Sequence, residues 1–335
     1  MFHSLGVDWN PEAECPTYVR VLREVFQLCD EPDEVIRHHL EMKGYLLSPR
    51  KPLPVIEVCI GSGANGKSLL NGMLVTAIAG GESVGLGPLT MFKMDMPSTT
   101  ARLKDKLVWI EPDLDHARVL PAGLLKAFSE NTMMTIEPKY MPPINIMSVV
   151  SWSLLSNELP RSNDASRGLM RRMYCFPYDF DFEAAGLADI GLLDKLLEEK
   201  EGIFRLWVQG LSRMLARGGH FDVPAECVAL RDSWMVSQNI LGAFISEMCE
   251  MQTGAETYTN KLYEAFRAFA MRDGTPGDQV MPQQQFTRKI GSVGGLKVVA
   301  GNANKRKVLG LSLRGWEAIE DDVSDVPQAG TGWLQ

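Results

Sequence analysis

Apolar residues recur at helical spacing through the first fifty positions of the chain. In PTYVRVLREVFQLCDEP, Tyr18, Val21 and Val25 fall on one face of a helix, and DEVIRHHLEMKGYLL predicts a second helix. Proline-containing pairs separate these two segments from each other and from the next part of the chain. We therefore expect residues 1–50 to form a helical N-terminal collar.

The pattern changes at residue 51, where short β-branched runs alternate with a helical segment. The runs VIEVCI and KLVWI, and part of INIMSVVSWSLL, predict strands that are buried on both faces. Between the first two, SLLNGMLVTAIAGG predicts a helix that a glycine pair ends. Strands that alternate with helices indicate a parallel sheet. Residues 51–180 are therefore expected to form an α/β core.

Helical patterns return after residue 180, and residues 181–255 predict a helical lid or linker. In residues 256–318, two short helices precede GLKVVAGNANKRKVLGLSL, which predicts a hairpin with a basic tip. Helix, helix and hairpin in this order suggest a winged-helix DNA-binding domain. The polar, glycine-rich residues 319–335 predict a flexible tail.

Composition narrows the class of protein. The chain has 335 residues, 45% hydrophobic and 23% charged, which is ordinary for a globular protein of more than one packed unit. It has no apolar run of the roughly 18 residues that a membrane span needs, and its N-terminus has no secretory signal pattern. Six scattered cysteines without a CxxC pair argue against a zinc site or a disulfide framework. We therefore expect a cytoplasmic protein with reduced thiols and no membrane partner.

The net charge of −8 argues against a broad surface that coats DNA, but one stretch departs from it. Residues 288–314 contain no acidic residue. Their basic residues are Arg288, Lys289, Lys297, Lys305, Arg306, Lys307 and Arg314. This asymmetry fits a wing that contacts DNA, and a merely soluble basic loop is the alternative.

The segment after the first predicted strand carries the strongest chemical signal. It fits G-x-x-x-x-G-K-[ST] at every fixed position and runs Gly61, Ser62, Gly63, Ala64, Asn65, Gly66, Lys67, Ser68, with Leu69 next. Glycines let backbone N–H groups surround phosphates, and the helix that comes after the loop adds a favourable dipole. Lys67 is expected to reach the β- and γ-phosphates and Ser68 to bind Mg²⁺. The sequence therefore predicts a site for a nucleoside triphosphate, with ATP and Mg²⁺ as cofactors.

Polar side chains end the next two predicted strands. Glu111 and Asp113 follow KLVWI, where phosphoryl-transfer enzymes place a metal-binding or water-orienting carboxylate. The sequence leaves open which of the two binds metal. Asn157 ends SWSLLSN, where an amide can bond the attacking water or the γ-phosphate. A plain turn signal is the alternative for Asn157.

Two further features suggest contacts outside the chain. TMMTIEPKYMPPINIMSV predicts a hairpin with Lys139 and Tyr140 near its turn, and such a pair can grip a phosphate and brace a sugar. Such pairs are also common on surfaces. Arg171 and Arg172 belong to an arginine cluster beyond the sheet that suits an arginine finger or, for any one arginine, a solvated basic face.

Taken in order, GSGANGKS with Asn65 directly before Gly-Lys, LVWIEPD, KYMPP, LLSNELP and RRMYCFPY resemble the motifs of superfamily 3 helicases. The most similar group is the phage/plasmid primase–helicases related to the poxvirus primase–helicase. The resemblance implies an AAA+-type P-loop NTPase core, a hexameric ring with ATP hydrolysed between subunits, and single-stranded DNA gripped in the pore, usually with 3′→5′ translocation.

Position by position, the resemblance implies phosphate and Mg²⁺ ligands, an acidic motif, a pore hairpin, a polar sensor and an arginine finger. By this resemblance, Lys67 and Ser68 are the phosphate and Mg²⁺ ligands, and Glu111 with Asp113 forms the acidic motif. Lys139 and Tyr140 lie in the pore hairpin, Asn157 is the polar sensor, and Arg172 or Arg171 is the finger. The chain departs from the family at Ser129-Glu130-Asn131, where Gly-Gly-Asp is frequent, and in lacking the primase half. A separate primase or a longer parent protein would account for the second departure.

The leading hypothesis is a ring helicase that unwinds forked DNA in phage, plasmid or mobile-element replication. One alternative is an ATP-dependent initiator or loader that assembles on origin DNA without processive unwinding. Another is a nucleotide-binding regulator whose winged helix recognises an origin. Lys139, Tyr140 and the arginine cluster favour a motor over a regulator, but the sequence does not separate a motor from a loader.

Overall fold

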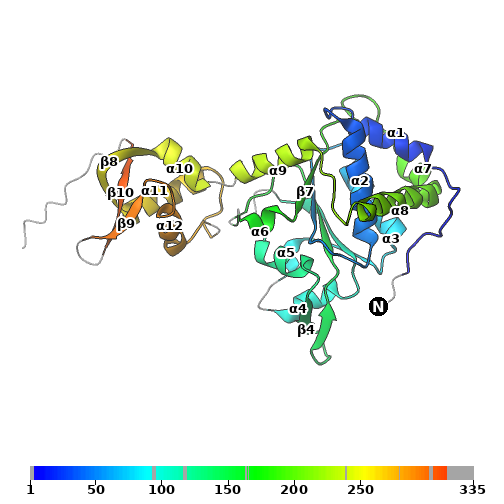
Figure 1. Cartoon of the computed structure of the whole chain (residues 1–335), viewed down its shortest axis with the longest axis horizontal. Helices are drawn as coiled ribbons and strands as arrows, with labels where there is room; N and C mark the ends of the chain where they lie inside the picture. The colour runs from blue at the N-terminus through cyan, green and yellow to red at the C-terminus, as the bar shows by residue number, and fades with distance from the viewer. Residues whose placement is uncertain are drawn as a thin grey trace, which may run out of the picture. The chain divides into compact units, whose positions relative to one another are not determined.

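The computed structural model describes residues 4–92, 96–115, 119–162, 164, 166–237, 240–278, 280–301 and 305–314. The predicted tail (319–335) and residues 302–304 of the basic hairpin tip lie outside the described residues. The chain divides into two compact units, whose elements Figure 1 labels. Unit 1 comprises Met1–Asn239 with Gly274–Gln279, and unit 2 comprises Ile240–Asp273 with Val280–Gln335.

A five-stranded sheet forms the centre of unit 1, and each pair of neighbouring strands is parallel. In spatial order the strands are β2 (Val84–Leu86), β3 (Val108–Leu114), β6 (Ser151–Ser156), β1 (Ile56–Ile60) and β7 (Met173–Pro177). All residues of β1 and β6 are buried, as expected for strands covered on both faces. The prediction of an α/β fold with a parallel sheet is therefore confirmed.

Helices cover both faces of this sheet (Figure 1). Alternate residues of β1 enter two different apolar clusters, since Cys59 belongs to one and Ile56, Val58 and Ile60 to the other. The helices that contribute to the first cluster are α1 (Pro16–Val25), α2 (Pro32–Leu47), η1 (Ser68–Met73), α3 (Leu74–Ala79), α7 (Leu192–Glu198), α8 (Lys200–Ala216) and α9 (Ala225–Ser237). The remaining described helices of unit 1 are η2 (Leu89–Met91), α4 (Pro97–Thr100), η3 (Ala101–Leu103), α5 (Ala122–Ser129) and α6 (Arg167–Met170).

The predicted collar does not form a separate body. Tyr18 and Val21 of α1 are buried in the same cluster as Cys59 of β1, and the backbone N–H groups of Thr17 and Tyr18 donate to the Glu199 carboxylate at 3.0 Å each. Glu199 thereby caps the start of α1. The division expected at residue 50, and the one at 180, therefore fall inside one compact unit, because contacts between distant segments bury their apolar faces.

A two-stranded antiparallel hairpin interrupts unit 1 between α5 and β6. Its strands are β4 (Met133–Ile136) and β5 (Ile144–Met147), and in the register Met133 lies opposite Met147. The hairpin projects from the body of the unit (Figure 1). It occupies the position that the alternating pattern predicts.

Unit 2 packs three helices against a three-stranded antiparallel sheet of order β8-β10-β9. Its elements are α10 (Ile240–Met248), β8 (Cys249–Tyr258), α11 (Thr259–Arg272), α12 (Gln283–Ile290), β9 (Lys297–Ala300) and β10 (Arg306–Leu313). The prediction of helix up to residue 255 is wrong, because the chain pairs with β10 from Cys249 onward. Such long-range pairing leaves no local signal. Among the described residues, no helix has the length and apolar character that crossing a membrane requires.

Candidate nucleotide site

The phosphate loop, Gly61–Ser68, leaves β1 and enters the helical segment formed by η1 and α3. Gly66 has φ +81°, a left-handed conformation that favours glycine. A Cβ on Gly61 would lie 1.9 Å from the carbonyl oxygen of Tyr178, whereas one on Gly63 would meet no atom within 4 Å. The loop is thus tight against the protein at its start and open at Gly63, where a ligand can approach.

Asn65 closes the loop from inside. Its side chain is 3% exposed, and its Nδ2 donates to the carbonyl of Ser62 and, at 2.8 Å, to the carbonyl of Tyr178. Its Oδ1 accepts from the Lys67 N–H at 3.3 Å. The position directly before Gly-Lys therefore ties the loop to itself and to the end of β7.

Lys67 lies across the mouth of the loop. Its Nζ donates to the Gly61 carbonyl at 2.5 Å, the Ser62 carbonyl at 3.2 Å and the Asn157 Oδ1 at 3.3 Å. Burial lowers the pKa of Lys67, and the nearby Cys59 and Asp113 oppose this shift. The ammonium is therefore held where it can exchange carbonyl oxygens for phosphate oxygens.

The two acids of β3 occupy different environments. Glu111 is 4% exposed, and its Oε2 accepts from the backbone N–H of Leu89 at 2.9 Å. Burial raises the pKa of Glu111 to about 7; the Leu89 bond opposes this, and the charges of Asp113 and Asp115 add to it. Asp113 is exposed beside an irregularity in the pairing of β3 with β6. The structure thus separates two carboxylates that the sequence left equivalent.

The donors around the loop suit Mg²⁺. Ser68 offers a hydroxyl and Glu111 and Asp113 offer carboxylate oxygens, the ligand type that this ion prefers. Among the described residues, no group of three or more His, Cys, Asp or Glu side chains could hold a metal ion by itself. Ser68, Glu111 and Asp113 therefore fit an ion that also takes ligands from phosphate and water.

The structure separates the two arginines proposed as the finger. Arg172 is 2% exposed, its Nη2 pairs with the Glu130 carboxylate, and its Nη1 donates to the Gly168 carbonyl. Arg171, next to it, is exposed. Without a rearrangement, Arg171 is therefore the one of the two that can reach another molecule. The Glu130 contact was not predicted from the sequence, which marked this position only as a departure from the family.

The hairpin tip carries Lys139 and Tyr140. Tyr140 is 91% exposed, and the Lys139 Nζ lies 4.9 Å from the centre of its ring. Met141, beside them, is 60% exposed. The tip therefore presents a cation and an aromatic ring to solvent.

An apolar pocket beside the loop was missed by the sequence reasoning. It has a volume of about 150 Å³, and Ala64, Gly66 and Leu69 form its loop side. Val21 of α1 and Phe182, which lies beyond β7, line it as well. Three charged residues, Arg20, Glu24 and Asp189, belong to its lining too, so the pocket combines an apolar surface with polar groups. These residues are distant in sequence, so only their spacing in the fold reveals them.

Comparisons with known proteins concern the fold of the chain. A family model described as a family of unknown function, DUF5906, matches residues 59–172, from within β1 to the residue before β7. No curated protein matches the sequence.

Two solved apo structures of the NrS-1 C-terminal region are similar, each over 93% of this chain and 79% of that chain. The first is 13% identical with a TM-score of 0.55, and the second is 14% identical with a TM-score of 0.52. A JCV helicase structure aligns with 78% of this chain and 66% of that one, at 14% identity and a TM-score of only 0.37. The chain therefore shares its fold with the NrS-1 C-terminal region.

Proposed function

We propose that the chain is an ATP-dependent ring helicase that translocates on single-stranded DNA and unwinds duplex in phage, plasmid or mobile-element replication. The observation that carries this proposal is the hydrogen bond between Lys67 and Asn157, which follow the adjacent strands β1 and β6. Glu111 and Asp113 lie on β3, the next strand in the sheet. The residues predicted as phosphate loop, acidic motif and polar sensor thus lie at one edge of the sheet, which supports an AAA+-type core.

In this proposal the phosphate loop holds ATP. Lys67 binds the β- and γ-phosphates, and Ser68 with Glu111 or Asp113 holds Mg²⁺, which would neutralise charge on the phosphates. Asp113 is exposed and acts electrostatically on Lys67, so it suits the metal; Glu111, buried and raised in pKa, suits the orientation of water. Asn157 would sense the γ-phosphate by donating from its Nδ2, while its Oδ1 accepts from Lys67.

Two exposed features of unit 1 would contact other molecules in this proposal. Arg171 would complete the nucleotide site of a neighbouring copy, and such head-to-tail contacts close into rings, here of six copies. Lys139 and Tyr140 would then face the central channel and grip the DNA backbone. The exposure of these three side chains supports the assignment.

Unit 2 supports a second contact with DNA. Its order of helix, strand, helix, helix and two strands supports a winged-helix domain. A groove of about 620 Å³ has no carboxylate among the described residues that line it. These are Thr259, Asn260, Gln283, Gln284, Thr287, Lys305 and Arg306. The same groove favours the second candidate, an initiator or loader that assembles on origin DNA, with a separate primase as a further partner.

A strand-displacement assay on a forked duplex tests the proposal, with the mass of the assembly measured alongside. We expect ATP-dependent release of the displaced strand by an oligomer, and none by the Lys67→Ala variant. Assembly on DNA with ATP turnover but without strand release would favour the loader. A monomer that neither assembles nor hydrolyses ATP would exclude both.

A further inference from the structure

Tyr178, the residue after β7, bonds the residue before the phosphate loop, one residue within it and one beyond it. Its N–H donates to the Ile60 carbonyl at 2.6 Å, where the chain enters the loop. Its carbonyl accepts from the Asn65 Nδ2 at 2.8 Å. Its hydroxyl accepts from the Asn71 Nδ2 at 2.9 Å, just beyond the loop. A single residue from outside the loop thus spans the whole of it.

Asn71 lies in an unusual turn of helix. Residues Ser68–Met73 are π-helical, and the Leu74 N–H donates to the carbonyl of Leu69, five residues earlier. Such turns are rare and concentrate at functional sites, because they leave backbone groups with altered partners. Here the Asn71 Nδ2 also donates to the Lys67 carbonyl at 2.8 Å. A side chain therefore fixes the carbonyl at which the loop becomes helix.

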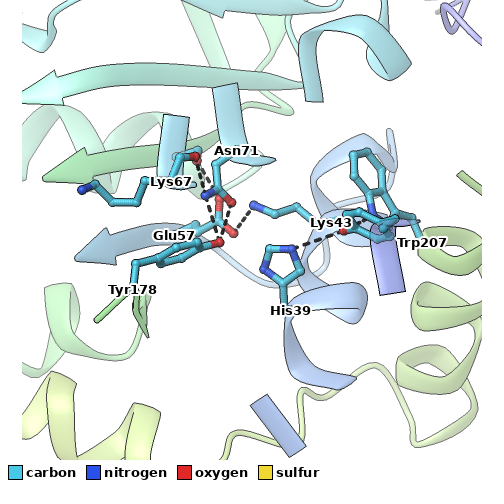
Figure 2. A network of polar contacts seen from close by, with 9 residues as sticks. His39, Lys43, Glu57, Lys67, Asn71, Tyr178 and Trp207 are labelled. Carbon is cyan, nitrogen blue, oxygen red and sulfur yellow. Dashed lines mark hydrogen bonds and ion pairs between the residues drawn. The ribbon is translucent and has the colours of Figure 1, made fainter. Parts of the chain in front are cut away.

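Figure 2 shows Asn71 between the main chain of Lys67 and the hydroxyl of Tyr178, while the Lys67 side chain points away from this network. Asn71 and Tyr178 are both 0% exposed. The ring of Phe26 packs edge-on against Tyr178 with centroids 5.3 Å apart, which restricts the phenol to its present orientation. Neither side chain can touch a bound nucleotide, so any effect on the site passes through the loop.

We propose that Asn71 and Tyr178 are positioning residues of the nucleotide site. They hold the Lys67 carbonyl, and with it the turn that carries Ser68, in the shape that receives a triphosphate. The inference rests on the proposed nucleotide-binding function and deepens it. Together with Asn65, these two side chains hold the loop in its conformation, so they reduce the ordering that binding requires.

Two substitutions isolate the contacts. Tyr178→Phe keeps the ring and both backbone contacts and removes only the hydroxyl. Asn71→Leu keeps the approximate size of the side chain and removes its hydrogen bonds to the Lys67 carbonyl and to the Tyr178 hydroxyl. Thr76→Val is the matched control, because the Thr76 hydroxyl donates to the Gly72 carbonyl at 2.7 Å in the same helical segment but does not contact the loop.

Steady-state kinetics and titration with ATP and ADP provide the first readout. We expect Asn71→Leu to raise the KM for ATP and the Kd of both nucleotides by about tenfold, and Tyr178→Phe by about threefold. kcat should change less than KM. The double variant should match Asn71→Leu, since the hydroxyl acts through Asn71. Thr76→Val should leave KM unchanged, which separates positioning from a general loss of stability.

Hydrogen exchange of the nucleotide-free protein provides a readout that does not depend on turnover. The amides of residues 61–68 should exchange faster in both variants and not in Thr76→Val. Unchanged exchange with unchanged KM, in a wild type that hydrolyses ATP, overturns the inference and leaves the proposed function standing. A wild type that binds no nucleotide removes the proposed function, whatever the exchange shows. If Asn71→Leu does not fold, Tyr178→Phe decides alone.

Discussion

The phosphate loop and the tip of the β4–β5 hairpin differ in where their polar groups find partners. In the loop, Lys67 is 6% exposed and bonded to oxygens of its own chain, and Asn65 is tied to Tyr178. At the tip, Tyr140 is 91% exposed with Lys139 over its ring. Both segments carry a lysine that the sequence marked for function, yet only one of the two lysines is fixed by the fold.

This difference indicates what each segment needs. A loop whose shape is determined inside the chain can bind its ligand by exchanging existing hydrogen bonds, with little reordering. An exposed cation and aromatic ring are already solvated, so they add little to the stability of the folded chain. They contribute binding energy only when they contact a second molecule. We therefore expect mutations in the loop to affect chemistry, and mutations at the tip to affect only the response to DNA.

The largest effect is expected from Lys67→Ala. Loss of the ammonium should lower ATP hydrolysis by at least about 100-fold, because no other group replaces its charge at the phosphates. Phosphate release measured over time gives the result. Lys106→Ala is the control, since Lys106 is a lysine whose Nζ bonds carbonyls in an exposed setting. Normal turnover in Lys67→Ala would make the loop irrelevant to the activity.

Lys139→Ala and Tyr140→Ala should have a smaller and selective effect. Basal ATP hydrolysis and the melting temperature should stay at wild-type values, because both side chains are exposed at the tip. The additional hydrolysis caused by single-stranded DNA should fall by about tenfold, as expected for a lost backbone contact and a lost stacking surface. Rates with and without a DNA oligonucleotide show this. Full stimulation in both variants would show that the tip does not contact DNA during hydrolysis.

The arginine pair extends the comparison to stability. Arg172→Ala should lower the free energy of unfolding by about 1–3 kcal/mol, less than for a fully buried pair because Glu130 is 44% exposed. Arg171→Ala should leave it unchanged and lower ATP turnover instead. Urea denaturation measures the first effect. Equal stability of the two variants would show that the burial of Arg172 has no energetic weight.

An effect that depends on pH concerns the interior of unit 1. His38 is 1% exposed and stacks on Phe176, and burial lowers its pKa to about 3. The unfolded chain takes up the proton below about pH 6.5, so stability is lost as pH falls from there toward 3. His38→Phe should remove about 2 kcal/mol of this loss between pH 7 and 5. Urea midpoints at both pH values test it, and an unchanged difference between them would count against a neutral, buried His38.

The sequence predicted the features that depend on local pattern. Gly61–Ser68, the strand before it and the hairpin that presents Lys139 and Tyr140 follow from glycine placement and short alternating runs. The three-residue strand β2 was missed because it is too short to show a period. β7, a strand of five residues that ends in Pro177, was missed as well.

The rest depends on contacts between distant residues. Tyr178 bonds Asn71 across 107 positions, and Glu130 pairs with Arg172 across 42. No local sequence pattern predicts either contact. The sequence thus predicted which residues carry chemistry, and the fold shows which of them are held in place.

The central claim is that the nucleotide site is half built within one chain and is completed by the next copy. Mixing Lys67→Ala with Arg171→Ala tests it most directly. Each variant alone should hydrolyse ATP very slowly, whereas the mixture should recover part of the wild-type rate, because some interfaces then join an intact loop to an intact arginine. A mixture no faster than its two components, although the two proteins are shown to assemble together, would contradict the account.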